Sequence, residues 1–297
     1  ALDRVAPGGV APLAMADEEG GGVQRLAGVV APFAWPRRLA QTMTVRHVEA
    51  LGATVGAEMA HAGVGADLAP VLDVDGGAGP SATDVDGLRS FSADPSAAAA
   101  YGSAFADGLA RGGVIAVVKH FPGLGAATGN TDYGPMATVP LSALRAGGLI
   151  PFRAAINAGV PAVMVSNATV PGLSTVPASL SGSVIGGLLR RQLGFSGLVV
   201  TDSLSAGAIS DAGYTLGTAA VAAVRAGADM VLFGSTLTAA QALLLEPPEV
   251  AATTNAIVAA LSDAVTSGAL PADTLDAAVV QVLHAKHVDL CTGAPGG

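Results

Sequence analysis

The sequence predicts an α/β fold of the (β/α)8 TIM-barrel type that lacks its first one or two βα units. Short apolar runs alternate with longer stretches of helical spacing, which is typical of βα units and a parallel sheet. The runs are continuously apolar, as expected of strands buried on both faces. Polar residues follow five successive runs, and such a pattern is typical of the catalytic face of a barrel.

Six apolar runs are the expected strands, whereas a closed barrel of this type has eight. They cover residues 12–16, 68–74, 114–118, 162–165, 198–201 and 230–233. The first run begins close to the start of the sequence, so we expect the missing units to be absent from this chain or built differently. An open, doubly wound sheet of six strands is the alternative.

Helical spacing between the runs predicts the covering helices. They cover residues 38–62, 95–111, 181–193, 216–226 and 238–245, with a last helix over 271–289. Residues 76–87 and 123–140 are expected to be loops, and the length of the second favours a functional role. Since no linker divides the chain, we expect a single domain over residues 1–297, ending in a frayed tail over 292–297.

The composition excludes several classes of function. A net charge of −9 argues against a nucleic-acid-binding protein, which would carry a basic patch. No apolar run is long enough for a transmembrane helix. Cys291 is the single cysteine, so the chain has neither an internal disulfide nor a cysteine-rich metal site. No signal peptide is visible, although one could have been removed.

The polar residues after the strands are the candidate site. Asp202 follows a buried run directly, so it is either a catalytic carboxylate or the N-cap of the next helix, and the residues alone leave both open. Lys119 and His120 follow the third run, and their side chains could hydrogen-bond sugar hydroxyls. A structural histidine is the alternative for His120. Asp73 and Asp75 are expected to be structural.

Five segments, in order along the chain, resemble motifs of family 3 glycoside hydrolases, in particular the bacterial β-N-acetylglucosaminidase branch. They are DEEGGGVQR at 17–25, APVLDV at 69–74, RSF at 89–91, KHFPGLG at 119–125 and TDSLS at 201–205. The resemblance implies a retaining mechanism, in which two groups flank the scissile bond. It makes Asp202 the nucleophile. The substrate-binding residues that it implies are Asp17, Arg25, Arg89, Lys119 and His120.

The chain departs from the family pattern at the acid/base. The branch that it resembles has a histidine there, in a D-[ST]-H loop after the KHFPGxG motif, whereas this chain has Asn130, Thr131 and Asp132. Leu124 also replaces a usual histidine, and Gly22 a common arginine. Asp132 is therefore the candidate acid/base. An ordinary aspartate is ionised at neutral pH, so this role requires a raised pKa.

Three hypotheses follow for the function. The first is a retaining hydrolase of terminal β-linked N-acetylglucosamine, such as that of peptidoglycan fragments. The second is a catalytically impaired homologue that binds the sugar, and the third is an enzyme that forms a Schiff base through Lys119.

We expect an amino sugar or a muropeptide as ligand. We expect no cofactor and no metal, since neither the residue spacing of a metal site nor a phosphate-binding loop is present. Cell-wall turnover would slightly favour an envelope or secreted location over the cytoplasm, and the sequence specifies no oligomeric state.

Overall fold

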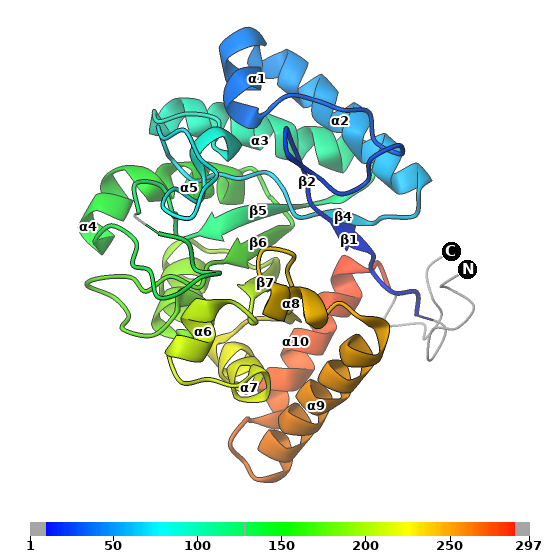
Figure 1. The fold of residues 1–297 in the computed structure, drawn as a ribbon, viewed down its shortest axis with the longest axis vertical. Coiled ribbons are helices and arrows are strands. Elements are labelled where there is room, and N and C mark those ends of the chain that lie inside the picture. The colour runs from blue at the N-terminus through cyan, green and yellow to red at the C-terminus, as the bar shows by residue number, and fades with distance from the viewer. Residues whose placement is uncertain (1–9, 128, 289–297) are drawn as a thin grey trace.

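The computed structural model describes residues 10–127 and 129–288, and its centre is a six-stranded parallel sheet (Figure 1). The strands are β1 (Met15–Ala16), β4 (Ala66–Asp67), β5 (Ile115–Phe121), β6 (Ala162–Val165), β7 (Leu198–Ser203) and β8 (Met230–Leu232). Each strand pairs with the next one in the order β1-β4-β5-β6-β7-β8. The order never reverses, so the sheet is an incomplete barrel and the doubly wound alternative is wrong.

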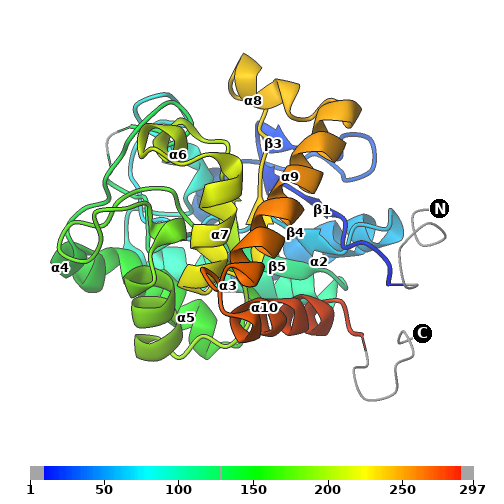
Figure 2. The same cartoon turned by 90° about the horizontal axis from the view of Figure 1, so that it is seen from below.

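Helices connect and cover these strands. The longer ones are α1 (Pro36–Thr42), α2 (Val45–His61), α3 (Pro95–Arg111), α5 (Leu149–Asn157), the π-helix η6 (Ser183–Gln192), α7 (Leu216–Ala226), α9 (Pro247–Thr266) and α10 (Ala272–Ala285). Short turns of helix are η3 (Gly87–Arg89), α4 (Leu141–Ala143), η4 (Leu144–Gly148), η5 (Ala178–Leu180), α6 (Gly207–Asp211) and α8 (Ala239–Leu243). Figure 2 shows α7, α9 and α10 next to one another in the middle of the view, and α7 contacts both of the others. No helix among the described residues is both long and apolar enough to cross a bilayer.

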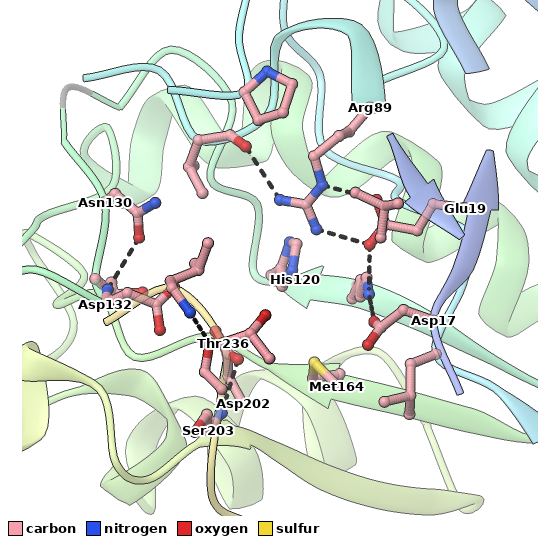
Figure 3. A pocket seen from close by; sticks show the side chains of 18 of the residues that line it. Asp17, Glu19, Arg89, His120, Asn130, Asp132, Met164, Asp202, Ser203 and Thr236 are labelled. Atoms are coloured by element: carbon pink, nitrogen blue, oxygen red, sulfur yellow. Dashed lines mark hydrogen bonds and ion pairs between the residues drawn. The ribbon is translucent and has the colours of Figure 1, made fainter. Parts of the chain in front are cut away.

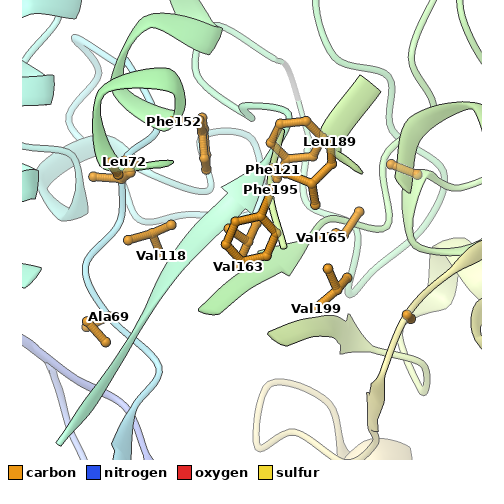
Figure 4. Close-up of a cluster of buried hydrophobic side chains, with 14 of the residues drawn as sticks. Ala69, Leu72, Val118, Phe121, Phe152, Val163, Val165, Leu189, Phe195 and Val199 are labelled. Atoms are coloured by element: carbon orange, nitrogen blue, oxygen red, sulfur yellow. The ribbon is translucent and has the colours of Figure 1, made fainter. Parts of the chain in front are cut away.

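Two apolar layers lie on the two faces of the sheet. On the outer face, Val118, Val163 and Val199 pack against the helices in a large buried cluster (Figure 4). On the inner face, Val117, Met164 and Val200 belong to a second cluster, which side chains of α10 join. Neighbouring strand residues alternate between the two layers because successive side chains of a strand point to opposite faces. Both faces are therefore buried, as the continuous apolar runs predicted.

The strand predicted over 68–74 is shorter and lies earlier in the chain. Its ladder is confined to β4, and beyond it a single bridge joins Val71 to Lys119. Pro70 has no N–H, so it cannot donate to the ladder, although its carbonyl accepts from the Lys119 N–H at 3.1 Å. The strand predicted over 12–16 is likewise reduced to β1.

The helix predicted over 38–62 is two helices. Helix α1 ends at Thr42, and α2 begins at Val45 after Thr44, whose hydroxyl accepts from the His47 N–H and caps the second helix. The last predicted helix ends early, at Ala285. Cys291 and the tail expected over 292–297 lie outside the described residues.

Helices α5 (Leu149–Asn157) and α9 (Pro247–Thr266) and a two-stranded hairpin were not predicted from the sequence. The hairpin pairs β2 (Glu18–Gly20) with β3 (Val23–Gln24) in antiparallel orientation. It follows β1 immediately and therefore fixes the acidic segment that begins at Asp17.

Helices α2 and α3 approach each other closely through glycines. A Cβ placed on Gly108 would lie 2.2 Å from the Glu49 carbonyl oxygen, and one on Gly52 would lie 2.6 Å from the Phe105 carbonyl oxygen. Both neighbours are backbone atoms that cannot move without moving a helix. The contact therefore requires glycine on both helices.

The substitution Gly108→Ala should lower the free energy of unfolding by about 1–3 kcal/mol, because the two helices must separate to admit a methyl group. Urea denaturation monitored by circular dichroism measures the change. Gly182→Ala is the matched control, since a Cβ there meets no atom within 4 Å and the backbone is right-handed helical. Equal stability of both variants would show that the helix contact is not a constraint.

Candidate active site

The inward positions of three strands deliver the central charged residues of the pocket. Lys119 lies two residues after Val117 on β5, and Asp202 two residues after Val200 on β7. Asp17 lies two residues after Met15 in the same way. Because side chains alternate along a strand, each charged group continues the inner apolar face at its carboxyl end. This is the end at which barrel enzymes place their catalytic groups.

These residues surround a cavity of about 590 Å³ (Figure 3). Its floor includes Leu68, Met164 and Leu232, which continue the inner apolar layer. All seven residues predicted for the site line it, namely Asp17, Arg25, Arg89, Lys119, His120, Asp132 and Asp202. The volume lies within the range of about 300–1,000 Å³ that is usual for small-molecule pockets.

A network of buried charges forms one wall of the pocket. Lys119 Nζ lies 2.7 Å from Asp17 Oδ1 and 2.6 Å from Glu19 Oε1. Arg89 donates two hydrogen bonds to the Glu19 carboxylate, from Nε to Oε2 at 2.7 Å and from Nη2 to Oε1 at 2.8 Å. Glu19 and Lys119 are buried, whereas the Asp17 side chain keeps 33% of its surface exposed. Asp17 is therefore the member of the network most open to a ligand.

The network keeps its members ionised. Burial alone would lower the pKa of Lys119, but the charges of Asp17 and Glu19 raise it to about 12. Burial would raise the pKa of Glu19, but Arg89 and Lys119 hold it well below its usual range. A lysine that stays protonated is a poor nucleophile, so the geometry weighs against the Schiff-base hypothesis.

Asp73 orients His120. The His120 Nδ1 lies 2.7 Å from Asp73 Oδ2, and Asp73 also accepts from the backbone N–H groups of His120 and Leu124 at 3.1 and 2.7 Å. Burial and the Arg89 charge lower the pKa of His120 to about 4. The ring is therefore neutral near pH 7, with Nδ1–H donating to Asp73, which leaves Nε2 as an acceptor.

Asp86 completes a buried group with this pair. One ligand atom from each of Asp73, Asp86 and His120 lies within 4.8 Å of the others, a spacing that could hold a metal ion. The 2.7 Å contact between His120 and Asp73 is a hydrogen-bond distance, and burial beside Asp73 raises the pKa of Asp86. Neither oxygen of Asp86 has a hydrogen-bond partner among the described residues. This group could not be predicted from the sequence, because its members come from three separate segments.

Asp132 is fixed by its surroundings, although its loop has no regular structure. Its backbone N–H donates to Asn130 Oδ1 at 2.9 Å, and its carbonyl accepts from the Gly207 N–H at 3.0 Å. Its carboxylate accepts from Gln241 Nε2 at 3.2 Å. Burial raises the pKa of Asp132, which is the direction that a proton donor requires.

Asp202 is not a helix cap. It belongs to β7, and the next helix, α6, has Ala206 at its N-cap without a side-chain hydrogen bond. The Asp202 carboxylate accepts from the Ser203 N–H at 2.7 Å. Burial raises its pKa, the charge of His120 opposes this, and the charge of Asp132 raises it further. The two candidate catalytic carboxylates therefore influence each other across the pocket.

Three residues of this site were not predicted from the sequence, and one predicted residue, Arg25, makes no ion pair among the described residues. Glu19, Asp86 and Gln241 were not predicted, although Glu19 lies two residues from Asp17 in the first motif and so shares its side of the hairpin. Gln241 follows no motif. Arg25 is exposed at the pocket, and the ion pairs of residues 10–127 and 129–288 do not include it.

The family can be assigned from the sequence as a whole. The profile of the "Glycosyl hydrolase family 3 N terminal domain" matches residues 4–285. The chain belongs to glycosyl hydrolase family 3. The resemblance to this family is thereby confirmed.

Relatives of this family 3 chain share most of its length. Beta-hexosaminidase LpqI of Mycobacterium tuberculosis is 39% identical over 293 residues, which cover 95% of this chain and 70% of that protein. A beta-hexosaminidase of Xylella fastidiosa is 35% identical over 233 residues, covering 74% and 67% respectively.

Solved structures agree with the fold. A family 3 glycosyl hydrolase of Mycobacterium smegmatis has a TM-score of 0.81 and 38% identity, covering 92% of this chain and 82% of that one. The family 3 β-N-acetylglucosaminidase of a Paenibacillus strain has a TM-score of 0.84 and 32% identity, covering 96% of this chain and 52% of that one.

The substitution Glu19→Gln should lower the free energy of unfolding by about 3–5 kcal/mol, because it removes the charge that pairs with buried Lys119 and Arg89. Equilibrium denaturation in urea measures this. Glu49→Gln is the control: Glu49 pairs with Arg111 at 2.8 Å on the surface, and losing such a pair costs less than about 1 kcal/mol. A loss at Glu19 no larger than at Glu49 would mean that the network contributes little to stability.

Proposed function

We propose that this family 3 chain is a retaining glycosidase that removes terminal β-linked N-acetylglucosamine, with Asp202 as nucleophile and Asp132 as acid/base. The observation that carries the proposal is the pair of carboxyl groups, both with raised pKa, that line one sugar-sized cavity opposite a charged wall. The names of the relatives, beta-hexosaminidase and β-N-acetylglucosaminidase, support the choice of sugar.

The charged wall would hold the sugar. Asp17 has free carboxylate surface and can accept from two neighbouring hydroxyl groups, while Lys119 Nζ holds it in place. His120 Nε2 can accept from another hydroxyl. Arg89 is engaged with Glu19 and adds positive potential at the wall, and Arg25 can donate from the exposed edge. These contacts would fix the sugar ring so that its anomeric carbon faces Asp202.

The reaction needs two proton transfers. In the first step an Asp202 oxygen bonds to the anomeric carbon, the glycosidic carbon–oxygen bond breaks, and protonated Asp132 gives its proton to the departing oxygen. In the second step ionised Asp132 takes a proton from water, whose oxygen bonds to the anomeric carbon and releases Asp202. The raised pKa of Asp132 serves the first step, because it keeps the acid protonated above the usual range of an aspartate.

Peptidoglycan fragments are the natural substrates that we propose, with residues 1–297 acting as a single domain. A relative from Arthroderma benhamiae, 35% identical over 221 residues, is named a secreted glycosyl hydrolase, which supports a location outside the cytoplasm.

A sugar-binding homologue without turnover is the second candidate. The observation that favours it is that an aspartate with an amide partner occupies the position of the expected histidine.

The first test is hydrolysis of 4-nitrophenyl N-acetyl-β-glucosaminide by the wild type and by Asp202→Ala. We expect turnover in the wild type and its loss in the variant, because no covalent intermediate can form without this carboxylate. Calorimetric titration with N-acetylglucosamine should show that the variant still binds the sugar. Binding without turnover in the wild type would establish the sugar-binding alternative.

The pH dependence of kcat/KM follows from the two pKa shifts. Activity requires ionised Asp202 and protonated Asp132, so it should fall as pH drops through the raised pKa of Asp202 and fall as pH rises through the raised pKa of Asp132. The optimum is expected on the acidic side of neutrality.

Asp132→Asn should remove the alkaline limb and lower kcat/KM by about 100- to 10,000-fold for substrates with poor leaving groups. An unchanged alkaline limb in this variant would assign the acid to another group.

A further inference from the structure

Gln241 is the buried residue of α8, and its side chain contacts the candidate acid/base, Asp132, which lies 109 residues earlier in the chain. Its side chain is only 3% exposed, whereas Leu243 in the same short helix is 63% exposed. Its Nε2 lies 3.2 Å from Asp132 Oδ1, 3.3 Å from the Asp132 carbonyl oxygen and 3.4 Å from the Ser205 carbonyl oxygen. One amide group thus joins α8, the loop that carries Asp132 and the segment that follows Asp202.

We propose that Gln241 is a positioning residue that holds the Asp132 carboxyl group for proton transfer in both steps of hydrolysis, an inference that rests on the function proposed above. Backbone hydrogen bonds from Gly207 and Ala208 fix the main chain of this loop, to the carbonyl oxygens of Asp132 and Thr131. They leave the torsions of the Asp132 side chain free. The contact from Gln241 to Oδ1 is what orients the carboxyl group itself.

The amide nitrogen of Gln241 has three acceptors, whereas its oxygen has no partner in the part of the chain that the structure describes. Among the described residues, Gln241 Oε1 is buried and has no hydrogen-bond partner. A buried polar atom without a partner is destabilising, and an apolar side chain of similar size would avoid this loss. The side chain therefore keeps an unused acceptor beside the residue that must exchange a proton.

A carboxamide suits a group that alternates between acid and base. Its Nε2–H can donate to ionised Asp132, and after rotation of the amide its Oε1 can accept from the O–H of protonated Asp132. A lysine or arginine at this position would favour the carboxylate and so weaken the acid. The neutral amide holds the side chain in either protonation state, and the buried Oε1 without a partner is the atom that the acid form would use.

The test compares Gln241→Met with the wild type on two substrates. N,N′-diacetylchitobiose has a poor leaving group that needs a proton, whereas 2,4-dinitrophenyl N-acetyl-β-glucosaminide has a leaving group that departs without one. We expect kcat/KM to fall by about 10- to 100-fold for the disaccharide and to stay within about threefold for the dinitrophenyl glycoside. Thermal denaturation confirms that the variant is folded at the assay temperature. Gln281→Met is the matched control, since Gln281 lies on α10 and donates to the Ser196 carbonyl at an exposed site.

A second variant, Gln241→Glu, tests the contact with the proton. A carboxyl group beside Asp132 should favour the protonated form and move the alkaline limb of kcat/KM to higher pH. The inference is overturned if Gln241→Met lowers kcat/KM equally for both substrates, if it changes neither, or if Gln241→Glu leaves the alkaline limb in place. Failure of the proposed function looks different: the wild type itself would then turn over neither substrate.

Discussion

The double ion pair at Lys119 Nζ is the interaction on which the pocket depends. Without it, Asp17 and Glu19 would present like charges to each other, and buried Glu19 would rely on Arg89 alone. Buried charges are tolerated only when they are paired and hydrogen-bonded. Since Lys119 comes from β5, Glu19 from the hairpin and Arg89 from η3, the same contacts that neutralise the charges also hold three distant segments together.

The two carboxylates of the proposed chemistry both have a raised pKa. Burial raises the pKa of Asp202, the charge of His120 opposes this, and the charge of Asp132 raises it further. Burial also raises the pKa of Asp132, and the hydrogen bond from Gln241 opposes this. Because each negative charge disfavours the other, one member of such a pair can be ionised while the other holds a proton. The loss of the family histidine is in this way compatible with proton donation.

How far the sequence predicts this molecule depends on the range of the contacts. Five of the six strands overlap a predicted apolar run, because such runs are local, and the inward residues Lys119 and Asp202 followed from their place at strand ends and from the motifs. The strand expected over 68–74 was misplaced because Pro70 interrupts the ladder. Gln241 could not be predicted, since its partner Asp132 lies 109 residues away and the helical spacing over 238–245 does not indicate which distant segment the helix contacts.

The open topology of the sheet has a consequence for a bound sugar. Strands β1 and β8 are the two ends of the sheet, yet Asp17 beyond β1 and Leu232 on β8 line the same cavity. A ring held between them would connect the two edges, which the backbone ladder itself leaves apart. Ligand binding would then stabilise the two edge strands of an incomplete barrel, and amide hydrogen exchange in β1 and β8 would become slower.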